Sequence, residues 1–161
     1  AAGRCAGRLR HLECYRPETE GVLVAYSSIY GHTAELPTAC RGPAREGRGD
    51  GCHGPGPLRY GRAVAQAFRF SKLVLATPTY NADVFPFMKE FIHHLTERNY
   101  QNRTVAFIEN GSWAPMAAKV MTKMLEGSKN LTYAATTVTV RGALNAASEA
   151  QLAALADELS R

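Results

Sequence analysis

Three short polar stretches contain the residues of this chain that could do chemistry, and each follows an apolar run. They cover residues 27–33, 77–82 and 109–113. Hydroxyl groups and backbone N–H groups in a loop after a strand are neutral donors that suit a phosphate. Tyr80 and Trp113 add two aromatic rings. Together the stretches suit a ligand with a phosphate at one end and a flat ring at the other.

Apolar runs place these stretches at the ends of strands. Residues 22–26, 72–77 and 104–108 are short and nearly continuous apolar runs, as strands buried on both faces are. A fourth, β-branched strand is expected within 131–140. Parallel strands present their carboxyl ends at one edge of a sheet, so the three polar stretches are expected to gather there.

A helix is expected over residues 83–98. Asp83 is a suitable N-cap residue, and the apolar side chains that follow recur at helical spacing on one face. That face consists of Phe87, Phe91, Ile92 and Leu95.

Two further helices are expected near the C-terminus. One covers residues 114–125, with Pro115 in its first turn and Gly127 as its stop signal. The other covers residues 148–160 and is capped by Ser148. Alternating strands and helices of these lengths predict an α/β fold with right-handed crossovers, a mostly parallel sheet and helices on both faces.

Residues 36–62 break this pattern. They are crowded with Gly, Pro and Arg and lack apolar periodicity, yet they stand where the first helix and second strand of such a fold belong. Those two elements are therefore doubtful. The first 17 residues have a similar composition. We hypothesise that both zones are out-of-frame translations of GC-rich coding sequence; the alternative is a genuine flexible or disordered insertion.

Composition narrows the classes of function. The 161 residues predict one domain, and no run approaches the roughly 20 apolar residues of a membrane span. The net charge of +5 does not indicate a nucleic-acid partner, because the arginines before position 65 are scattered among Gly and Pro. The four cysteines lack CxxC spacing. A reduced, cytoplasmic setting is expected, without membrane or nucleic-acid partners.

The polar stretches resemble those of flavodoxin-like, FMN-binding proteins, and more narrowly the C-terminal flavodoxin domain of the A-type flavoproteins (flavodiiron proteins). YSSIYGHT at 26–33 is similar to the phosphate loop of the family, with His32 in place of the usual Asn. LATPTYNADVFPFMKEF at 75–91 is similar to the Thr-Pro-Thr-Tyr-Asn loop followed by Phe-Pro. FIENGSWAPMAAK at 107–119 is similar to the loop whose aromatic residue lies beside the flavin. The likeness covers 21–34 and 63–161.

The resemblance implies a flavodoxin-like three-layer sandwich with strand order 2-1-3-4-5 and FMN as cofactor. The domain would span 21–161, after a linker or irregular tail over 1–20. The first stretch would hold the phosphate, the second would approach the isoalloxazine edge, and Trp113 would stack near the ring. The backbone of Asn81 and Ala82 would lie beside flavin N5. The implied FMN contacts are Ser27, Ser28, Ile29, Tyr30, Gly31, His32, Thr33, Thr77, Pro78, Thr79, Tyr80, Asn81, Asn110, Gly111, Ser112 and Trp113.

The resemblance also implies an electron-transfer module that is not catalytically complete alone. In the family a preceding β-lactamase-like domain with a diiron site reduces oxygen or nitric oxide, and its metal-ligand run is absent from this chain. Implied partners are that domain and an electron donor, either rubredoxin-like or a reductase. A homo-oligomer is a further candidate assembly.

Two alternatives stay open. A stand-alone flavodoxin-like NAD(P)H:quinone reductase shares the character of the first stretch, although the residues after Tyr80 do not match its usual pattern. A damaged domain that does not bind flavin is the other, because 36–62 lacks a convincing first helix. A response-regulator receiver is excluded by the absence of acidic residues after the first strand. A Rossmann dehydrogenase is excluded by the missing GxGxxG.

Overall fold

The computed structural model describes residues 14–27, 48–51, 57–111, 114–142 and 145–160. Seven strands and four helices lie in these ranges. In chain order they are β1 (Thr19–Tyr26), β2 (Arg48–Gly51), α3 (Pro57–Arg69), β3 (Phe70–Tyr80), β4 (Asp83–Val84), α4 (Pro86–Glu97), β5 (Arg103–Asn110), α5 (Ala117–Leu125), β6 (Leu131–Tyr133), β7 (Val138–Val140) and α6 (Ala146–Ser160).

The strands form one sheet in the order β2-β1-β3-β5-β6, and all pairs along this path are parallel. The short β4 pairs antiparallel with the end of β3, and β7 continues beside β5 past the end of β6. Without the β4 hairpin, this is the expected order 2-1-3-4-5, so the predicted α/β topology is confirmed. The expected fourth strand within 131–140 is split in two.

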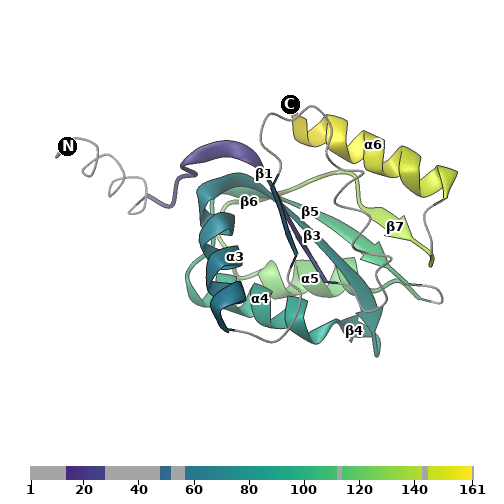
Figure 1. Ribbon diagram of the computed structural model, residues 1–161, viewed down its shortest axis with the longest axis horizontal. Coiled ribbons are helices and arrows are strands. Elements are labelled where there is room, and N and C mark those ends of the chain that lie inside the picture. Colours follow the sequence, from purple (N-terminus) through teal and green to yellow (C-terminus); the bar gives the residue numbers. More distant parts are fainter. Residues whose placement is uncertain (1–13, 28–47, 52–56, 112–113, 143–144, 161) are drawn as a thin grey trace.

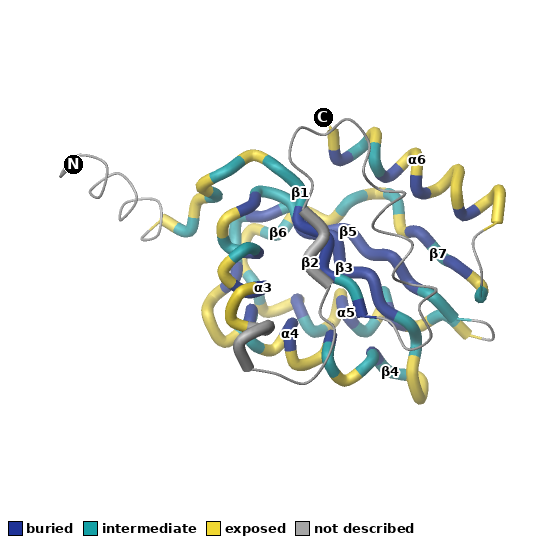
Figure 2. The backbone as a smooth tube through the Cα atoms, in the orientation of Figure 1, coloured by how far each residue is buried: buried dark blue, intermediate teal, exposed yellow. Residues whose placement is uncertain are grey.

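Helices lie on both faces of the sheet, with α3, α4 and α5 on one side and α6 on the other (Figure 1). Alternate residues of the central strands face opposite layers. Leu73 and Leu75 of β3 join the core under α3, α4 and α5, while Val74 and Ala76 join the core under α6. The buried strands therefore run through the middle of the molecule (Figure 2). Within the described ranges, no helix combines the length and apolar character needed to cross a membrane.

The predicted cap of the helix over 83–98 is wrong. Asp83 lies in β4, and α4 begins at Pro86 without a side-chain cap. The residue before a proline is disfavoured in the helical region, and Phe85 is extended at φ −57°, ψ 135°. The predicted apolar face is nearly right. Its buried members are Met88, Phe91, Ile92 and Leu95, with Met88 taking the place expected for the half-buried Phe87.

The other two predicted helices also begin elsewhere. Helix α5 starts at Ala117 rather than at 114, because the Met116 N–H donates to the Thr79 side chain at 3.2 Å and holds this segment outside the helix. Helix α6 starts at Ala146. Its cap is Asn145, whose side chain accepts from the Ser148 N–H while the Ser148 hydroxyl accepts from the Asn145 N–H, both at 2.9 Å.

The atypical stretch 36–62 contributes to two elements. The doubtful second strand is present as β2, which pairs with β1 from Leu23 to Tyr26. Helix α3 was not expected. It begins at Pro57, a favoured first helical residue, and buries Ala63, Val64 and Ala67 against the core. The expected first helix falls outside the described residues.

Candidate functional site

Strand register brings the ends of β1, β3, β5 and β7 together at one sheet edge. Tyr26 lies opposite Ala76, so the residues that follow them are neighbours. Thr77 lies opposite Glu109, and Glu109 lies opposite Thr139. The described parts of the three polar stretches therefore do meet at the carboxyl edge of the sheet, where α/β folds bind ligands.

The first layer of this edge is a row of polar side chains on the face that carries α5. In three strands the alternation that places two residues in this core continues to a polar residue two positions further on; these residues are Ser27, Thr77 and Glu109. On β7, Thr139 pairs with Glu109 and completes the row. The Ser27 and Thr77 hydroxyls bond to each other at 2.7 Å, and both residues are fully buried. We call Ser27, Thr77, Glu109 and Thr139 the polar row.

Glu109 is the charged member of the polar row, and its side chain joins three elements. It leaves β5, accepts the Ala118 N–H in the first turn of α5 at 2.9 Å, and accepts the Thr139 hydroxyl of β7 at 3.0 Å. Only 7% of the residue is exposed. Both carboxylate oxygens act as acceptors, as in an ionised carboxylate. No cation pairs with Glu109 among the residues that the structure describes.

The end of β3 turns back through a tight hairpin into β4. Tyr80 pairs with Asp83, and the two residues between them, Asn81 and Ala82, have φ values of +50° and +57°. Two positive φ angles match the type I′ hairpin turn, which is strained for alanine. Tyr80 is 45% exposed and meets Phe85 edge to face at 5.7 Å. This hairpin presents a ring and a strained main chain at the edge.

The end of β5 is held against its neighbours. The Asn110 amide donates to the Gly142 carbonyl and accepts the Gly142 N–H, both at 3.2 Å. The Gly111 N–H donates to the Val140 carbonyl at 2.9 Å. A Cβ on Gly111 would lie 3.1 Å from both the Thr79 hydroxyl oxygen and the Pro115 Cα. Both contacts are tighter than a Cβ normally makes, so a larger residue here would push on Thr79 and Pro115.

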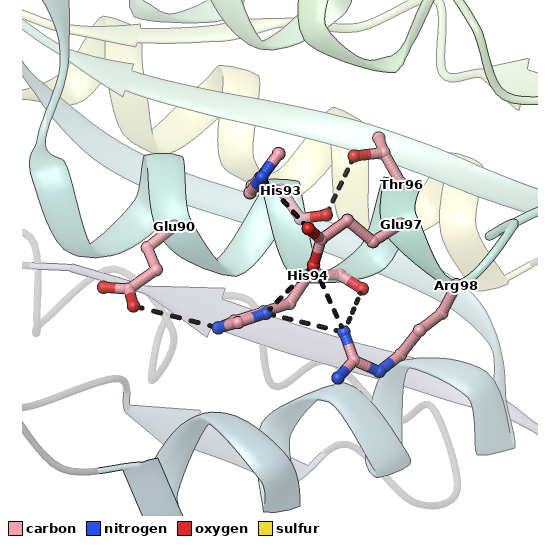
Figure 3. Close-up of polar contacts among 6 residues, drawn as sticks. All are labelled: Glu90, His93, His94, Thr96, Glu97 and Arg98. Carbon is pink, nitrogen blue, oxygen red and sulfur yellow. Dashed lines mark hydrogen bonds and ion pairs between the residues drawn. The ribbon is translucent and has the colours of Figure 1, made fainter.

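A groove of about 610 Å³ continues from the hairpin along α4. The lining residues are Tyr80, Asn81, Asp83, Val84, Pro86, Lys89, Glu90, His93 and Met124. Figure 3 shows the polar face of α4, where His93 faces Glu97 at 3.2 Å and His94 lies between Glu90 and Glu97. In the described part of the chain, no group of three or more His, Cys, Asp or Glu residues could hold a metal ion.

Half of the residues expected to contact a ligand can be placed. Ser27 and Thr77 are buried, Tyr80 and Asn81 are exposed, and the remaining four are half-buried. Those four are Pro78, Thr79, Asn110 and Gly111. The others lie outside the described residues and stay predictions: Ser28, Ile29, Tyr30, Gly31, His32, Thr33, Ser112 and Trp113.

The sequence analysis placed Glu109 in the third polar stretch but gave it no role, and it missed Thr139 and Gly142 as parts of this edge. The sequence did contain a signal that Glu109 is a buried, hydrogen-bonded carboxylate. A carboxylate that directly continues a buried apolar run must find donors, because an unpaired charge is costly to bury. Nothing local to the sequence indicates Thr139 or Gly142 as the partners.

Solved structures similar to this chain share its architecture. Rubredoxin oxygen:oxidoreductase from Desulfovibrio gigas matches with TM-score 0.83 and 18% identity, over 100% of this chain and 41% of that chain. A flavodoxin from the domain Archaea matches with TM-score 0.72 and 12% identity, over 88% of this chain and 96% of that flavodoxin. The fold is flavodoxin-like. The flavodiiron protein from Giardia intestinalis matches with TM-score 0.76 and 14% identity, over 96% of this chain and 38% of that protein.

These flavodoxin-like relatives differ in how much of their length is shared. The chain spans about two fifths of the D. gigas and Giardia proteins but nearly all of the archaeal flavodoxin. No protein-family model and no curated protein sequence matches the chain. At such low identities the likeness establishes the fold, and a function has to be argued from the site.

Proposed function

We propose that this chain is an FMN-binding electron-transfer module that belongs to a longer A-type flavoprotein oxidoreductase. The observation that carries the proposal is the meeting of the described polar stretches at the carboxyl edge of a flavodoxin-like sheet. FMN, when bound, supplies transfer of one or two electrons, and the protein supplies binding, orientation and electrostatics. A diiron domain in the longer protein would receive the electrons, and a rubredoxin-like protein or a reductase would donate them.

The donors and rings at the described edge fit a flavin. The exposed Tyr80 and the positive-φ turn after it can cover and contact a flat polar ring. The tightly packed Gly111 keeps the end of β5 close to β3 and free of side-chain bulk. The phosphate end of the site would be formed by residues 28–33, whose hydroxyl and backbone donors suit a phosphate.

Titration of the flavin-free protein with FMN tests the proposal. We expect quenching of flavin fluorescence with a saturable stoichiometry of one, and FMN as the chromophore released by denaturation. FAD and riboflavin are the comparison ligands, because they separate recognition of the terminal phosphate from recognition of the ring. A colourless protein that takes up no FMN would contradict the proposal and favour the damaged-domain alternative.

Substitution of two comparable tyrosines tests where the flavin binds. Tyr80 and Tyr133 are 45% and 38% exposed, and each ring lies 5.7–5.8 Å from a phenylalanine ring. Only Tyr80 lies at the carboxyl edge. We expect Tyr80→Ala to weaken FMN binding about tenfold, the loss of one stacking contact, and Tyr133→Ala to leave it unchanged. Equal effects would place the flavin elsewhere. Rapid reduction of the bound flavin by NAD(P)H would instead favour a quinone reductase.

A further inference from the structure

Glu109 is a buried charge that the proposed function does not yet use. It directly precedes the pair Asn110 and Gly111, at the sheet edge proposed to hold the flavin ring. Its two hydrogen bonds are to neutral donors, the Ala118 N–H and the Thr139 hydroxyl. Neutral donors and the start of a helix stabilise a carboxylate without cancelling its charge. The negative charge at this edge is therefore not neutralised by a side chain among the described residues.

The same hydrogen bonds fix where α5 begins. The cap residue of α5, Met116, makes no side-chain cap bond, and the first-turn N–H of Ala118 is satisfied by Glu109 instead. Thr79 holds the residue just before the helix through the Met116 N–H. Glu109 and Thr79 therefore hold the start of α5 against the ends of β5 and β3.

We propose that Glu109 is a positioning residue for the flavin, resting on the proposed function. It has two effects. Its hydrogen bond to Ala118 fixes the start of α5, close to the ends of β3 and β5 that are proposed to meet the ring. Its charge opposes the gain of electrons by a flavin bound at this edge, which lowers the midpoint potential, because charges act strongly on each other where water is excluded.

Three substitutions separate charge from hydrogen bonding. Glu109→Gln keeps the shape and one acceptor oxygen but removes the charge. Glu109→Asp keeps the charge but shortens the side chain. Glu158→Gln is the matched control, because Glu158 of α6 also accepts two backbone N–H groups, those of Ala135 and Thr136 at 2.7 and 3.1 Å, away from the end of β5.

The midpoint potential of bound FMN is the first measurement. We expect Glu109→Gln to raise the potential, and Glu109→Asp and Glu158→Gln to leave it near the wild-type value. A merely structural role for Glu109 would not move the potential in this pattern. If the wild type binds FMN and Glu109→Gln has the wild-type potential, the electrostatic part is overturned while the proposed function stands.

Amide hydrogen exchange in the flavin-free protein is the second measurement. Glu109→Ala should speed exchange at Ala118 about tenfold, because that N–H loses its acceptor, while Glu158→Gln should not. Unchanged exchange at Ala118 overturns the positioning part whether or not flavin binds. A wild type that takes up no FMN overturns both the proposed function and the claim about the potential.

Discussion

Arg103 is the buried side chain on which we base the sharpest stability test. It begins β5 at the amino edge of the sheet, opposite the proposed site, and is only 3% exposed. Among the described residues it has no ion-pair partner, and all of its hydrogen bonds go to main-chain carbonyl groups. The five acceptors are the carbonyl oxygens of Tyr15, Phe68, Phe70, Gln101 and Asn102, at 2.5–3.1 Å.

The expected loss in Arg103→Ala follows from the three acceptors on other segments. Phe68 and Phe70 lie where α3 ends and β3 begins, and Tyr15 lies before β1. A hydrogen bond to a charged group contributes about 1.5–3 kcal/mol, but removing the guanidinium also relieves its desolvation, so we take about 1 kcal/mol for each of the three. The total of about 3 kcal/mol corresponds to a fall in Tm of about 6–12 °C for a domain of this size.

Urea unfolding followed by circular dichroism measures this loss. Arg103→Lys should recover only part of it, because one ammonium cannot reach all three segments. Arg98→Ala is the control. The Arg98 side chain is 54% exposed, and we expect a change within about 0.5 kcal/mol. A free energy of unfolding for Arg103→Ala within 0.5 kcal/mol of wild type would refute the reasoning.

Two further predictions concern single residues near the site. Gly111→Ala should destabilise the protein by about 1–3 kcal/mol in urea unfolding, because its Cβ would meet the Pro115 backbone at 3.1 Å. Gly61→Ala is the control, because Gly61 lies within α3 with open space around it, and this change should stabilise the protein by about 0.5–1 kcal/mol. The opposite order of stabilities would contradict the packing at Gly111. The second prediction concerns Asp83, whose pKa is lowered from the ordinary value of 3.8. The larger cause is the hydrogen bond from the Lys89 ammonium, and the smaller is the hydrogen bond from the Val84 N–H. The ionised Asp83 carboxylate therefore stabilises the folded state above pH 3.8, and this contribution is lost as the pH falls through the lower pKa of the folded state. The urea midpoints of wild type and Asp83→Asn should differ at pH 7 and converge in acid.

The central strands could be predicted because the signal for each lies in its own consecutive apolar residues. Residues 73–76 and 105–108 are apolar at every position, as expected of short strands that are buried on both faces. The structure extends both runs, to Phe70–Tyr80 and Arg103–Asn110, because polar residues continue each strand beyond its buried part. Parallel pairing then brought the ends of the strands together without any further information.

Helix α3 and strand β2 were not predictable from the composition of 36–62. The buried face of α3 is made by Ala63, Val64 and Ala67, which are too small to stand out from their neighbours, and Gly61 within the helix lowers its propensity. β2 reads Arg-Gly-Asp-Gly, which carries no strand signal at all. Its pairing with β1 is a tertiary effect.

The starts of the helices were misplaced for a related reason, since partners distant in sequence decide them. Thr79 of β3 holds the Met116 N–H, and Glu109 of β5 accepts the Ala118 N–H in the first turn of α5. A capping rule that considers only neighbouring residues cannot find such partners. By contrast, Asn145 caps α6 from within the same segment, so a search for Asn three residues before Ser148 would have found it.

The edge of the sheet divides the predicted ligand contacts into two groups with different chemistry. The buried Ser27 and Thr77 hydroxyls share one hydrogen bond, and the Thr77 hydroxyl also has the Pro78 carbonyl oxygen as an acceptor at 3.4 Å. We infer that these hydroxyl groups join β1 to β3 rather than bind a ligand. Tyr80 and Asn81 are exposed and remain free to meet a ligand directly. Sequence alone predicted hydroxyl groups at the strand ends. Strand register decided which of them face each other, and burial then separates the groups that build the edge from those that can bind at it.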